Sequence, residues 1–279
     1  ASDILDVPIV IDDPDSESSW RPENSSGEFH GPTRLREALV RSRNLVSIRI
    51  LRDIGTRTLI DYAARFGFAR ASMPNDLTLA LGTLQATPLE VATGFAAFAN
   101  GGYRIEPFFI DRIEDATGKV VYEAAPREVC EQCGVPATST GAPELDAPLA
   151  LQAAASVRGG LALPPKDRIA ERIISPQNAY IMDDIMADVI RRGTGRRANV
   201  LNRSDIAGKT GTTNDSKDAW FNGFNRDLVA TVWVGYDQER SLGEGEEGSR
   251  TAVPIWVYFM REALKALPQH VRPRPEGVI

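Results

Sequence analysis

Residues 208–224 read GKTGTTNDSKDAWFNGF, and this stretch decides how the rest of the sequence is interpreted. Glycine in a strand often marks a place where another backbone comes close. Gly211 lacks the side chain that would keep a peptide away from a strand edge, where backbone donors and acceptors are offered. Lys209 adds a positive charge. These parts suit a peptide with an electrophilic carbonyl or a terminal carboxylate, although a polar strand end explains the tripeptide Lys-Thr-Gly equally well.

The surrounding sequence predicts a hairpin sheet. Strands are expected over 206–213, 219–224 and 228–236, and Asn225-Arg226-Asp227 forms a tight turn between the last two. A helix that starts at Ser175-Pro176 precedes them, and a closing helix over 253–267 follows. Helices before and after strands that are joined by hairpins predict an α+β fold, an antiparallel sheet with helices on both faces.

The first half of the chain is predicted to be mainly helical. Residues 1–32 are polar and contain prolines, which predicts a loop. Helices are expected over 33–41, 45–54 and 57–66, with Asn44 as the N-cap of the second. Thr87-Pro88-Leu89-Glu90 reads as a capping box that opens a helix ending at Asn100. Strands are expected over 107–114 and 119–123.

Composition and charge exclude several classes of function. The chain has 279 residues, of which 42% are hydrophobic, and a net charge of -6. An acidic chain is a poor partner for nucleic acid, which rewards clustered Lys and Arg. No apolar run has the length needed to cross a bilayer. From about 125 to 165, proline, alanine, glycine and small polar residues dominate, which predicts a flexible surface insertion.

Two cysteines occur, in the order Cys130-Glu131-Gln132-Cys133. A structural zinc site needs four ligands, and the sequence has no second cysteine pair. We therefore expect a local disulfide in a surface loop, formed where the compartment permits oxidation. The sequence predicts no metal and no cofactor.

A second short motif, Ser42-Arg43-Asn44, lies much earlier in the chain. A Ser-x-Asn pattern is expected about once by chance in a chain of this length, and a helix cap explains an isolated instance. The functional interpretation is a hydroxyl that relays protons and an amide that holds a peptide group of the substrate. Both side chains can reach one ligand if the motif lies on a short loop between helices.

Together the two motifs match S-x-N and K-T-G, two of the three signatures of the serine penicillin-recognising enzymes. Residues 208–224, with the strand LVATVWVGYD that follows, resemble the transpeptidase domain of class A penicillin-binding proteins. The runs GPTRLREALVRSRNLVSIRIL and TPLEVATGFAAFANGG resemble helices of that domain. The cysteine pair and the long insertion are similar to those of the 1A subtype of Gram-negative bacteria. The third signature, S-x-x-K, is absent from these 279 residues.

The resemblance implies a penicillin-binding transpeptidase or β-lactamase-like fold. Residues 1–279 would form the C-terminal part of the domain, with a flexible insertion at about 125–165. The helix that carries the nucleophilic serine, and the first strands of the family's sheet, would lie before Ala1. The other partners of the chain would then be peptidoglycan stem peptides and β-lactam antibiotics, at the periplasmic face of the bacterial inner membrane.

The activity that the resemblance implies is D,D-transpeptidation, the cross-linking of stem peptides by acyl transfer, and the fragment alone would be inactive. The resemblance implies three catalytic residues. Ser42 would relay a proton, Lys209 would supply positive potential, and the Thr212 N–H would complete the oxyanion hole. Substrate binding falls on Asn44, Thr210, Gly211 and Thr212. The alternatives are a serine β-lactamase and a pseudoenzyme or binding module of the same fold.

The remaining conspicuous residues have structural explanations. Thr213 and Asn214 are expected to serve the turn, and four aromatic residues are expected to be core residues: Trp220, Phe221, Trp233 and Trp256. Arg43 stands where many members of the family that the chain resembles have another residue, and its side chain need not face the site. Four arginines surround Gly193-Thr194-Gly195 and are expected to be a solvated helix end, with a groove-lining loop as the alternative: Arg191, Arg192, Arg196 and Arg197.

Overall fold

The computed structural model describes residues 3–12, 19–130, 133 and 164–279. These residues form two compact units, one from Ala1–Gly102 with Ile173–Ile279 and the other from Tyr103–Arg172. Most of the insertion predicted at about 125–165 lies outside the described residues. The motifs around Ser42 and Lys209 both belong to the first unit.

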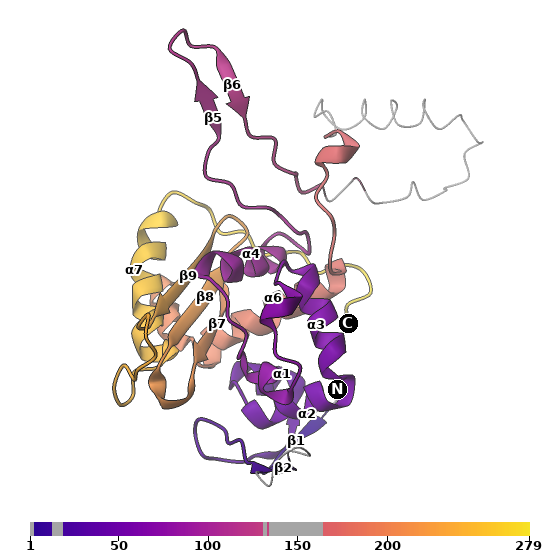
Figure 1. Ribbon diagram of the computed structural model, residues 1–279, viewed down its shortest axis with the longest axis vertical. Coiled ribbons are helices and arrows are strands. Elements are labelled where there is room, and N and C mark those ends of the chain that lie inside the picture. Colours follow the sequence, from indigo (N-terminus) through magenta and orange to yellow (C-terminus); the bar gives the residue numbers. More distant parts are fainter. Residues whose placement is uncertain (1–2, 13–18, 131–132, 134–163) are drawn as a thin grey trace, which may run out of the picture. The chain divides into compact units, whose positions relative to one another are not determined.

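The first unit is built on an antiparallel sheet of β7 (Ala207–Thr212), β8 (Ala219–Phe224) and β9 (Val229–Val234), in the order β7-β8-β9 (Figure 1). Its register places Gly211 opposite Trp220 and Phe224 opposite Val229. The three predicted strands are therefore confirmed, each within two residues of its expected bounds.

Helices cover both faces of this sheet, as predicted (Figure 1). Successive side chains of a strand point to opposite faces. On one face Phe221 packs edge-on against Trp256 of α7 (Val253–Ala263), with ring centroids 5.1 Å apart. On the other face Phe224 packs against α4 (Pro88–Ala99) and α6 (Pro176–Arg192). The sheet is thereby buried on both sides, which fixes the position of β7.

The helix starts follow the local sequence. Thr87 and Glu90 form the predicted capping box of α4, in which the Thr87 Oγ1 accepts from the Glu90 N–H and the Glu90 carboxylate accepts from the Thr87 N–H. The Ser175 hydroxyl accepts from the Asn178 N–H at the start of α6. A π-helical turn, Gly248–Ala252, leads into α7. The closing helix ends four residues earlier than predicted.

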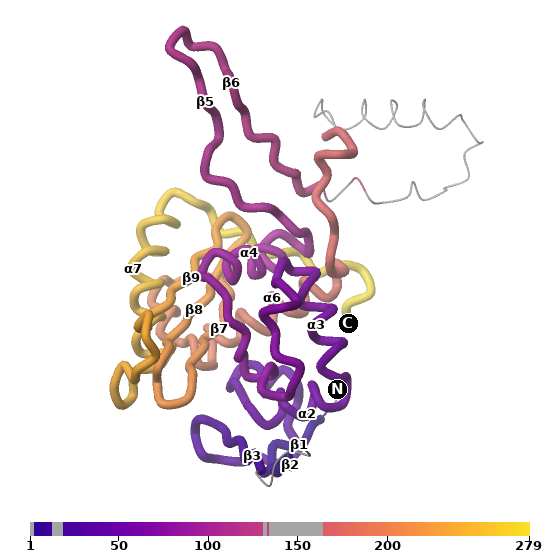
Figure 2. Tube along the Cα trace, viewed as in Figure 1, coloured from indigo at the N-terminus to yellow at the C-terminus, as the bar shows by residue number. Residues whose placement is uncertain are grey.

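The prediction of a loop over residues 1–32 is wrong where short strands form. β1 (Asp3–Asp6) pairs with β4 (Gly31–Arg34), and β2 (Ile11–Asp12) pairs with β3 (Ser19–Trp20). These strands lie beside helix α2, Asn44–Ile54 (Figure 2), and Ile9 packs in one cluster with Leu45 and Ile48 of that helix. Two- to four-residue strands carry too little periodicity to be read from sequence, because their stability comes from packing against distant residues.

Three helices follow as predicted: α1 (Leu35–Val40), α2 (Asn44–Ile54) and α3 (Thr56–Arg65). Short 3₁₀ turns, Arg70–Ser72 and Leu77–Leu81, lead to α4. The prediction that Asn44 caps α2 is wrong, because the helix begins at Asn44 and Arg43 occupies the cap position. The Asn44 Nδ2 instead donates to the Glu23 carbonyl at 2.9 Å.

The second unit contains a hairpin of β5 (Arg112–Glu114) and β6 (Val120–Glu123), shorter than the predicted strands. Its turn is held by the Asp115 carboxylate, which accepts from the N–H groups of Thr117 and Lys119. A 3₁₀ turn, Lys166–Arg168, lies near its end. Cys130 and Cys133 form a disulfide, as the sequence predicts.

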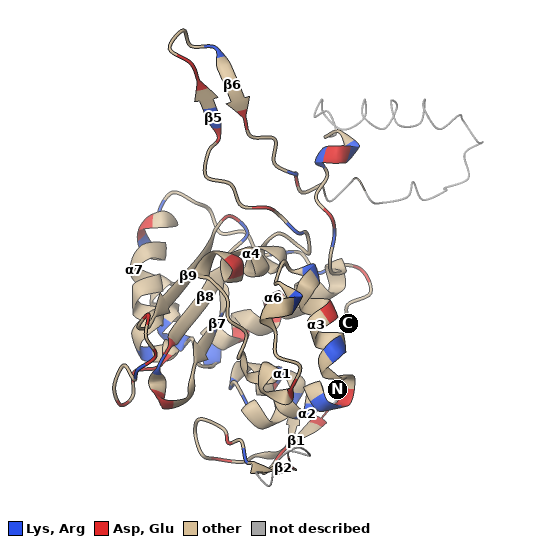
Figure 3. Cartoon of the chain, in the orientation of Figure 1, with Lys and Arg blue, Asp and Glu red and all other residues tan. Residues whose placement is uncertain are grey.

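Acidic and basic residues are both spread over the helices, strands and loops of the described chain (Figure 3). Several of them join α1 to α6, where Arg36 contacts Asp184 at 2.5 Å and Asp188 at 3.0 Å. Exposed ion pairs of this kind contribute little singly, so the packing of the two helices matters more. None of the described helices combines the length and the apolar character that a membrane crossing requires.

The packing of α7 on the sheet can be tested by substitution of one buried and one exposed residue of this helix. Trp256 is completely buried, and Tyr258 on the same helix is 76% exposed. We expect Trp256→Ala to lower the free energy of unfolding by about 3–5 kcal/mol, because it leaves a cavity against Phe221. Tyr258→Ala is the matched control and should change it by less than about 0.5 kcal/mol. Thermal unfolding of the protein checks both, and equal effects would contradict this packing.

Candidate active site

The side chains of the two short motifs meet. Lys209 Nζ donates to Ser42 Oγ at 2.8 Å, although 167 positions separate the two residues. The same ammonium donates to the Thr210 carbonyl at 2.8 Å, which fixes its direction. The hydroxyl of one motif and the cation of the other therefore form one polar centre.

Ser42 is held by the way α1 ends. Its φ of +55° is the left-handed conformation that usually requires glycine. The Ser42 N–H donates to Leu39 O at 3.1 Å and the Arg43 N–H donates to Ala38 O at 2.8 Å, the two bonds of a Schellman motif. A residue with a Cβ costs roughly 1 kcal/mol in this conformation. A serine at such a position, bonded to Lys209, is typical of a functional constraint.

Lys209 is placed by β7. Gly208 is required because a Cβ there would come within 2.8 Å of the Asn222 carbonyl on β8. A Cβ at Gly211 would lie 3.1 Å from the Trp220 Cβ, so the two strands are close along the whole motif. Within the described sheet β7 has β8 on one side only, which leaves its other edge unpaired by a strand.

Thr194 belongs to the site and was missed from the sequence. Its Oγ1 lies 2.6 Å from the Oγ1 of Thr210, and its N–H donates to the Val40 carbonyl at 3.4 Å. Gly193 permits this approach, since a Cβ there would lie 2.4 Å from the same carbonyl. The Gly-Thr-Gly sequence shortly before the strand was the pattern from which Thr194 could have been predicted. In the structure this segment links the end of α1 to β7.

The arginines around this loop divide into two groups. Arg191 and Arg192 pair with carboxylates of α6, at 3.5 and 3.2 Å from Asp188, so they belong to the helix end as predicted. Arg196 and Arg197 are exposed on the next 3₁₀ turn, Arg196–Leu201.

Gly248 is a second residue that was missed. Its N–H donates to Thr212 Oγ1 at 3.0 Å. A Cβ at this position would lie 2.3 Å from the Trp220 carbonyl and 2.5 Å from the Gly211 carbonyl, both backbone atoms. The π-helical turn is thus pressed against the Lys-Thr-Gly strand and orients the Thr212 hydroxyl.

A cavity of about 610 Å³ opens beside these residues. Asn44 and Thr212 both line it, so each motif contributes to one wall, whereas Ser42 and Lys209 are not among its lining residues. Its rim comes from the 3₁₀ turn Leu77–Leu81, the segment after it, and the β7–β8 connection. The volume of this cavity is large enough for a peptide-sized ligand.

The aromatic residues near the cavity differ from the prediction. Phe221 and Trp256 are core residues, as expected. Trp220 and Trp233 instead line the cavity, with ring centroids 6.0 Å apart, and Trp233 is 37% exposed. They point away from α7 because they alternate along the strands with the buried Phe221 of β8 and the partly buried Val232 of β9, which pack in the cluster with Trp256.

Thr213 and Asn214 serve the turn, as predicted, and also line the cavity. The Thr213 Oγ1 accepts from the Asp218 N–H at 2.7 Å, at the start of a 3₁₀ turn, Asn214–Ser216. Among the described residues, no cluster of three His, Cys, Asp or Glu side chains is placed to hold a metal ion.

Burial lowers the pKa of Lys209 to about 8 from an ordinary value of 10.5. The charged form is disfavoured because protein atoms replace water around the amine. The ammonium still predominates at neutral pH. The Ser42 hydroxyl therefore lies beside a cation that is easily deprotonated.

This pKa gives a direct test. In a pH titration of lysine side chains by NMR, Lys209 should titrate near pH 8, below its ordinary value of 10.5. Between pH 8 and 10.5 the unfolded chain binds more protons at this group than the folded chain. Its contribution to the free energy of unfolding therefore rises with pH over that window. Titration of Lys209 at the ordinary value of 10.5 would contradict the burial of the amine.

Comparisons with known proteins agree with this architecture. A family model described as "Penicillin binding protein transpeptidase domain" matches residues 6–255. Penicillin-binding protein 1A of Pseudomonas aeruginosa is 45% identical over 294 residues, which covers 100% of this chain and 35% of that protein. Penicillin-binding protein 1A of Neisseria lactamica is 42% identical over 277 residues, covering 99% of this chain and 30% of that protein.

A solved structure is also similar. The crystal structure of penicillin-binding protein 1A from Haemophilus influenzae superimposes with a TM-score of 0.83 at 35% sequence identity. The match covers 99% of this chain and 40% of that chain. The chain therefore spans about a third of the length of the relatives that it matches.

Proposed function

The chain belongs to the family of penicillin-binding protein transpeptidase domains, and from this premise we propose that its polypeptide is a peptidoglycan D,D-transpeptidase. The observation that carries the proposal is the 2.8 Å bond between Lys209 Nζ and Ser42 Oγ. It joins the two signature motifs beside a cavity of peptide size.

The reaction is an acyl transfer in two steps. A serine hydroxyl attacks the carbonyl of a D-Ala-D-Ala stem peptide, the peptide bond breaks, and the terminal D-alanine leaves with a proton on its amine. An amine of a second stem peptide then attacks the ester, forms the cross-link and releases the serine. The 279 residues contain no S-x-x-K. We infer that another part of the polypeptide supplies this serine, and that the isolated fragment is inactive.

Ser42 and Lys209 are the groups that we assign to proton transfer. The Ser42 hydroxyl relays a proton towards the leaving amine, and the ammonium at 2.8 Å favours the oxygen that carries negative charge during the transfer. A Lys209 with a pKa of about 8 holds its charge at neutral pH and can exchange a proton readily.

Substrate binding is assigned to Asn44 and Thr212, which line the cavity, and to Thr210 and Gly211, which precede Thr212 on β7 and are not among the lining residues. Asn44, which lines the cavity, holds a backbone amide of the stem peptide. The hydroxyls of Thr210 and Thr212 bind the terminal carboxylate, and each is oriented by a neighbour, Thr194 or Gly248. The bare Gly211 lets the peptide approach β7 as an added strand.

The oxyanion hole is proposed to use the Thr212 N–H and the N–H of the nucleophilic serine. One such donor typically lowers the barrier by about 3 kcal/mol. β-Lactams resemble the acyl donor, so the same serine would be trapped as a stable ester. The place of action is the periplasmic face of the bacterial inner membrane, where the stem peptides are.

The proposal is tested with fluorescent penicillin on the full-length protein. Lys209→Ala should slow covalent labelling by about a hundredfold or more, because a positioned proton-transfer group contributes 10²–10⁴-fold. The temperature of thermal unfolding should change little. The substitution loses the hydrogen bonds of the ammonium, but it also removes the unfavourable burial of a charge. Lys265→Ala, on an exposed lysine after α7, is the control and should label normally.

Two outcomes would favour other functions. Rapid release of the label, measured as turnover of a chromogenic cephalosporin, would indicate a serine β-lactamase. A wild-type protein that folds but forms no adduct would indicate a pseudoenzyme of the same fold.

A further inference from the structure

We propose that Arg43 is a positioning residue that holds the Ser42–Asn44 loop in its working conformation by pairing with the buried carboxylate of Asp6. The inference rests on the proposed function, because its consequence is the geometry of Ser42 and Asn44. Arg43 itself is not among the residues that line the cavity, and Lys209 bonds to Ser42, so Arg43 acts through its two neighbours.

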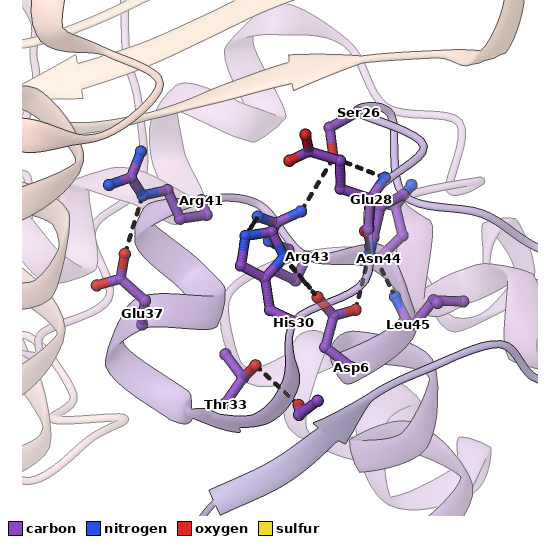
Figure 4. Close-up of polar contacts among 12 residues, drawn as sticks. Asp6, Ser26, Glu28, His30, Thr33, Glu37, Arg41, Arg43, Asn44 and Leu45 are labelled. Atoms are coloured by element: carbon purple, nitrogen blue, oxygen red, sulfur yellow. Dashed lines mark hydrogen bonds and ion pairs between the residues drawn. The ribbon is translucent and has the colours of Figure 1, made fainter.

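The Arg43 guanidinium lies in a polar cluster with Asp6, Ser26 and His30 (Figure 4). The Arg43 side chain is only 10% exposed, and its Nε lies 3.6 Å from Oδ2 of Asp6, which is fully buried at the end of β1. One guanidinium nitrogen donates to Ser26 Oγ at 3.0 Å, and another lies 2.9 Å from His30 Nε2. The guanidinium is thus held on three sides.

The same carboxylate also holds the start of α2 (Figure 4). Asn24 is 4% exposed, and its Nδ2 donates to Asp6 Oδ1 at 2.7 Å and to the Glu28 carbonyl at 2.9 Å. Its Oδ1 accepts from the Leu45 N–H at 3.4 Å. An N-cap side chain normally makes this hydrogen bond to an N–H group in the first turn of a helix. Asp6 therefore supports the loop through Arg43 and the helix through Asn24.

This support matters because Ser42 is in an unfavourable conformation. In a Schellman motif the residue after the left-handed position usually makes an apolar contact with the helix. Arg43 occupies that place, and an ion pair with the buried Asp6 carboxylate, at 3.6 Å and without a hydrogen bond to Asp6 Oδ2, replaces the apolar contact. Displacement of a reacting group by about 1 Å can cost a hundredfold in rate. Loosening Arg43 frees both neighbours, Ser42 and Asn44.

Burial of the pair explains why a charged residue can stand between the two motif residues. A buried carboxylate without a partner is strongly unfavourable, so Asp6 draws the guanidinium inward. The matched comparison is Arg41, two positions earlier. It is 52% exposed and pairs with Glu37 of α1 at 2.9 Å. Arg41 and Arg43 lie on the same loop, but the Arg41 side chain is exposed and the Arg43 side chain is buried beside Asp6.

The experiment measures the second-order rate constant for acylation of the full-length protein by fluorescent penicillin, together with the final number of labels per protein. We expect Arg43→Ala to be acylated at least about tenfold more slowly, with the same final stoichiometry. Arg43→Lys, which keeps a cation near Asp6, should recover part of the rate. Arg41→Ala should stay within about twofold of the wild type, because its surface pair contributes little.

A double-mutant cycle with Asp6→Asn separates positioning from unrelated damage. If Arg43 acts through Asp6, the double variant should be no slower than Arg43→Ala alone, since the second change removes a contact already lost. Wild-type rates in Arg43→Ala, or losses that multiply in the double variant, would overturn the inference. If Arg43→Ala does not fold, Arg43→Lys and Asp6→Asn decide: slow labelling to full stoichiometry supports it and wild-type rates overturn it.

The outcomes also separate this inference from the proposed function. Labelling of the wild type with no effect at Arg43 overturns the positioning role alone. Absence of labelling in the wild type overturns the transpeptidase assignment, and the positioning role with it.

Discussion

The hydrogen bond between Lys209 Nζ and Ser42 Oγ is the interaction on which the site depends. It joins the end of a helix to the middle of a strand, and neither element could place its residue alone. The Schellman motif presents the hydroxyl, and the pairing of β7 with β8 presents the ammonium. The loop at Thr194 closes the arrangement, because it bonds to both Val40 and Thr210.

Close packing of backbones keeps this arrangement rigid. Glycines at 193, 208 and 248 lie where a Cβ would come within 2.8 Å of a carbonyl oxygen on a neighbouring segment. Each one brings a further element against β7 or α1. The strand that carries Lys209 is held by β8 and by the π-helical turn, and the cavity opens beside it. A site that is fixed in this way needs little reorganisation when charge develops in a reaction.

Much of this could be predicted from the sequence, for local reasons. The capping box at Thr87, the turn at Asn225 and the strand β8 are encoded within a few residues of each element. The two motifs could be placed on a loop and a strand, and their resemblance to one family brought them together. The family match over residues 6–255 agrees with that interpretation.

The remainder depends on contacts between distant residues. The strands before residue 35 are stabilised by packing on α2, and nothing in their own pattern predicts them. Thr194 and Gly248 gain their roles only when their segments reach β7. Nothing within its motif indicates a role for Arg43, and its pairing with Asp6 spans 37 positions that include β2, β3, β4 and α1. Local propensity carries no information on such pairs.

The central claim is that Ser42 and Lys209 act as one unit, and a double-mutant cycle on acylation tests it most directly. The rates of Ser42→Ala, Lys209→Ala and the double variant would be measured with fluorescent penicillin in the full-length protein. If the 2.8 Å bond is part of the mechanism, the double variant should be about as slow as the slower single variant. Losses that multiply would show that the two groups act independently and would contradict the account.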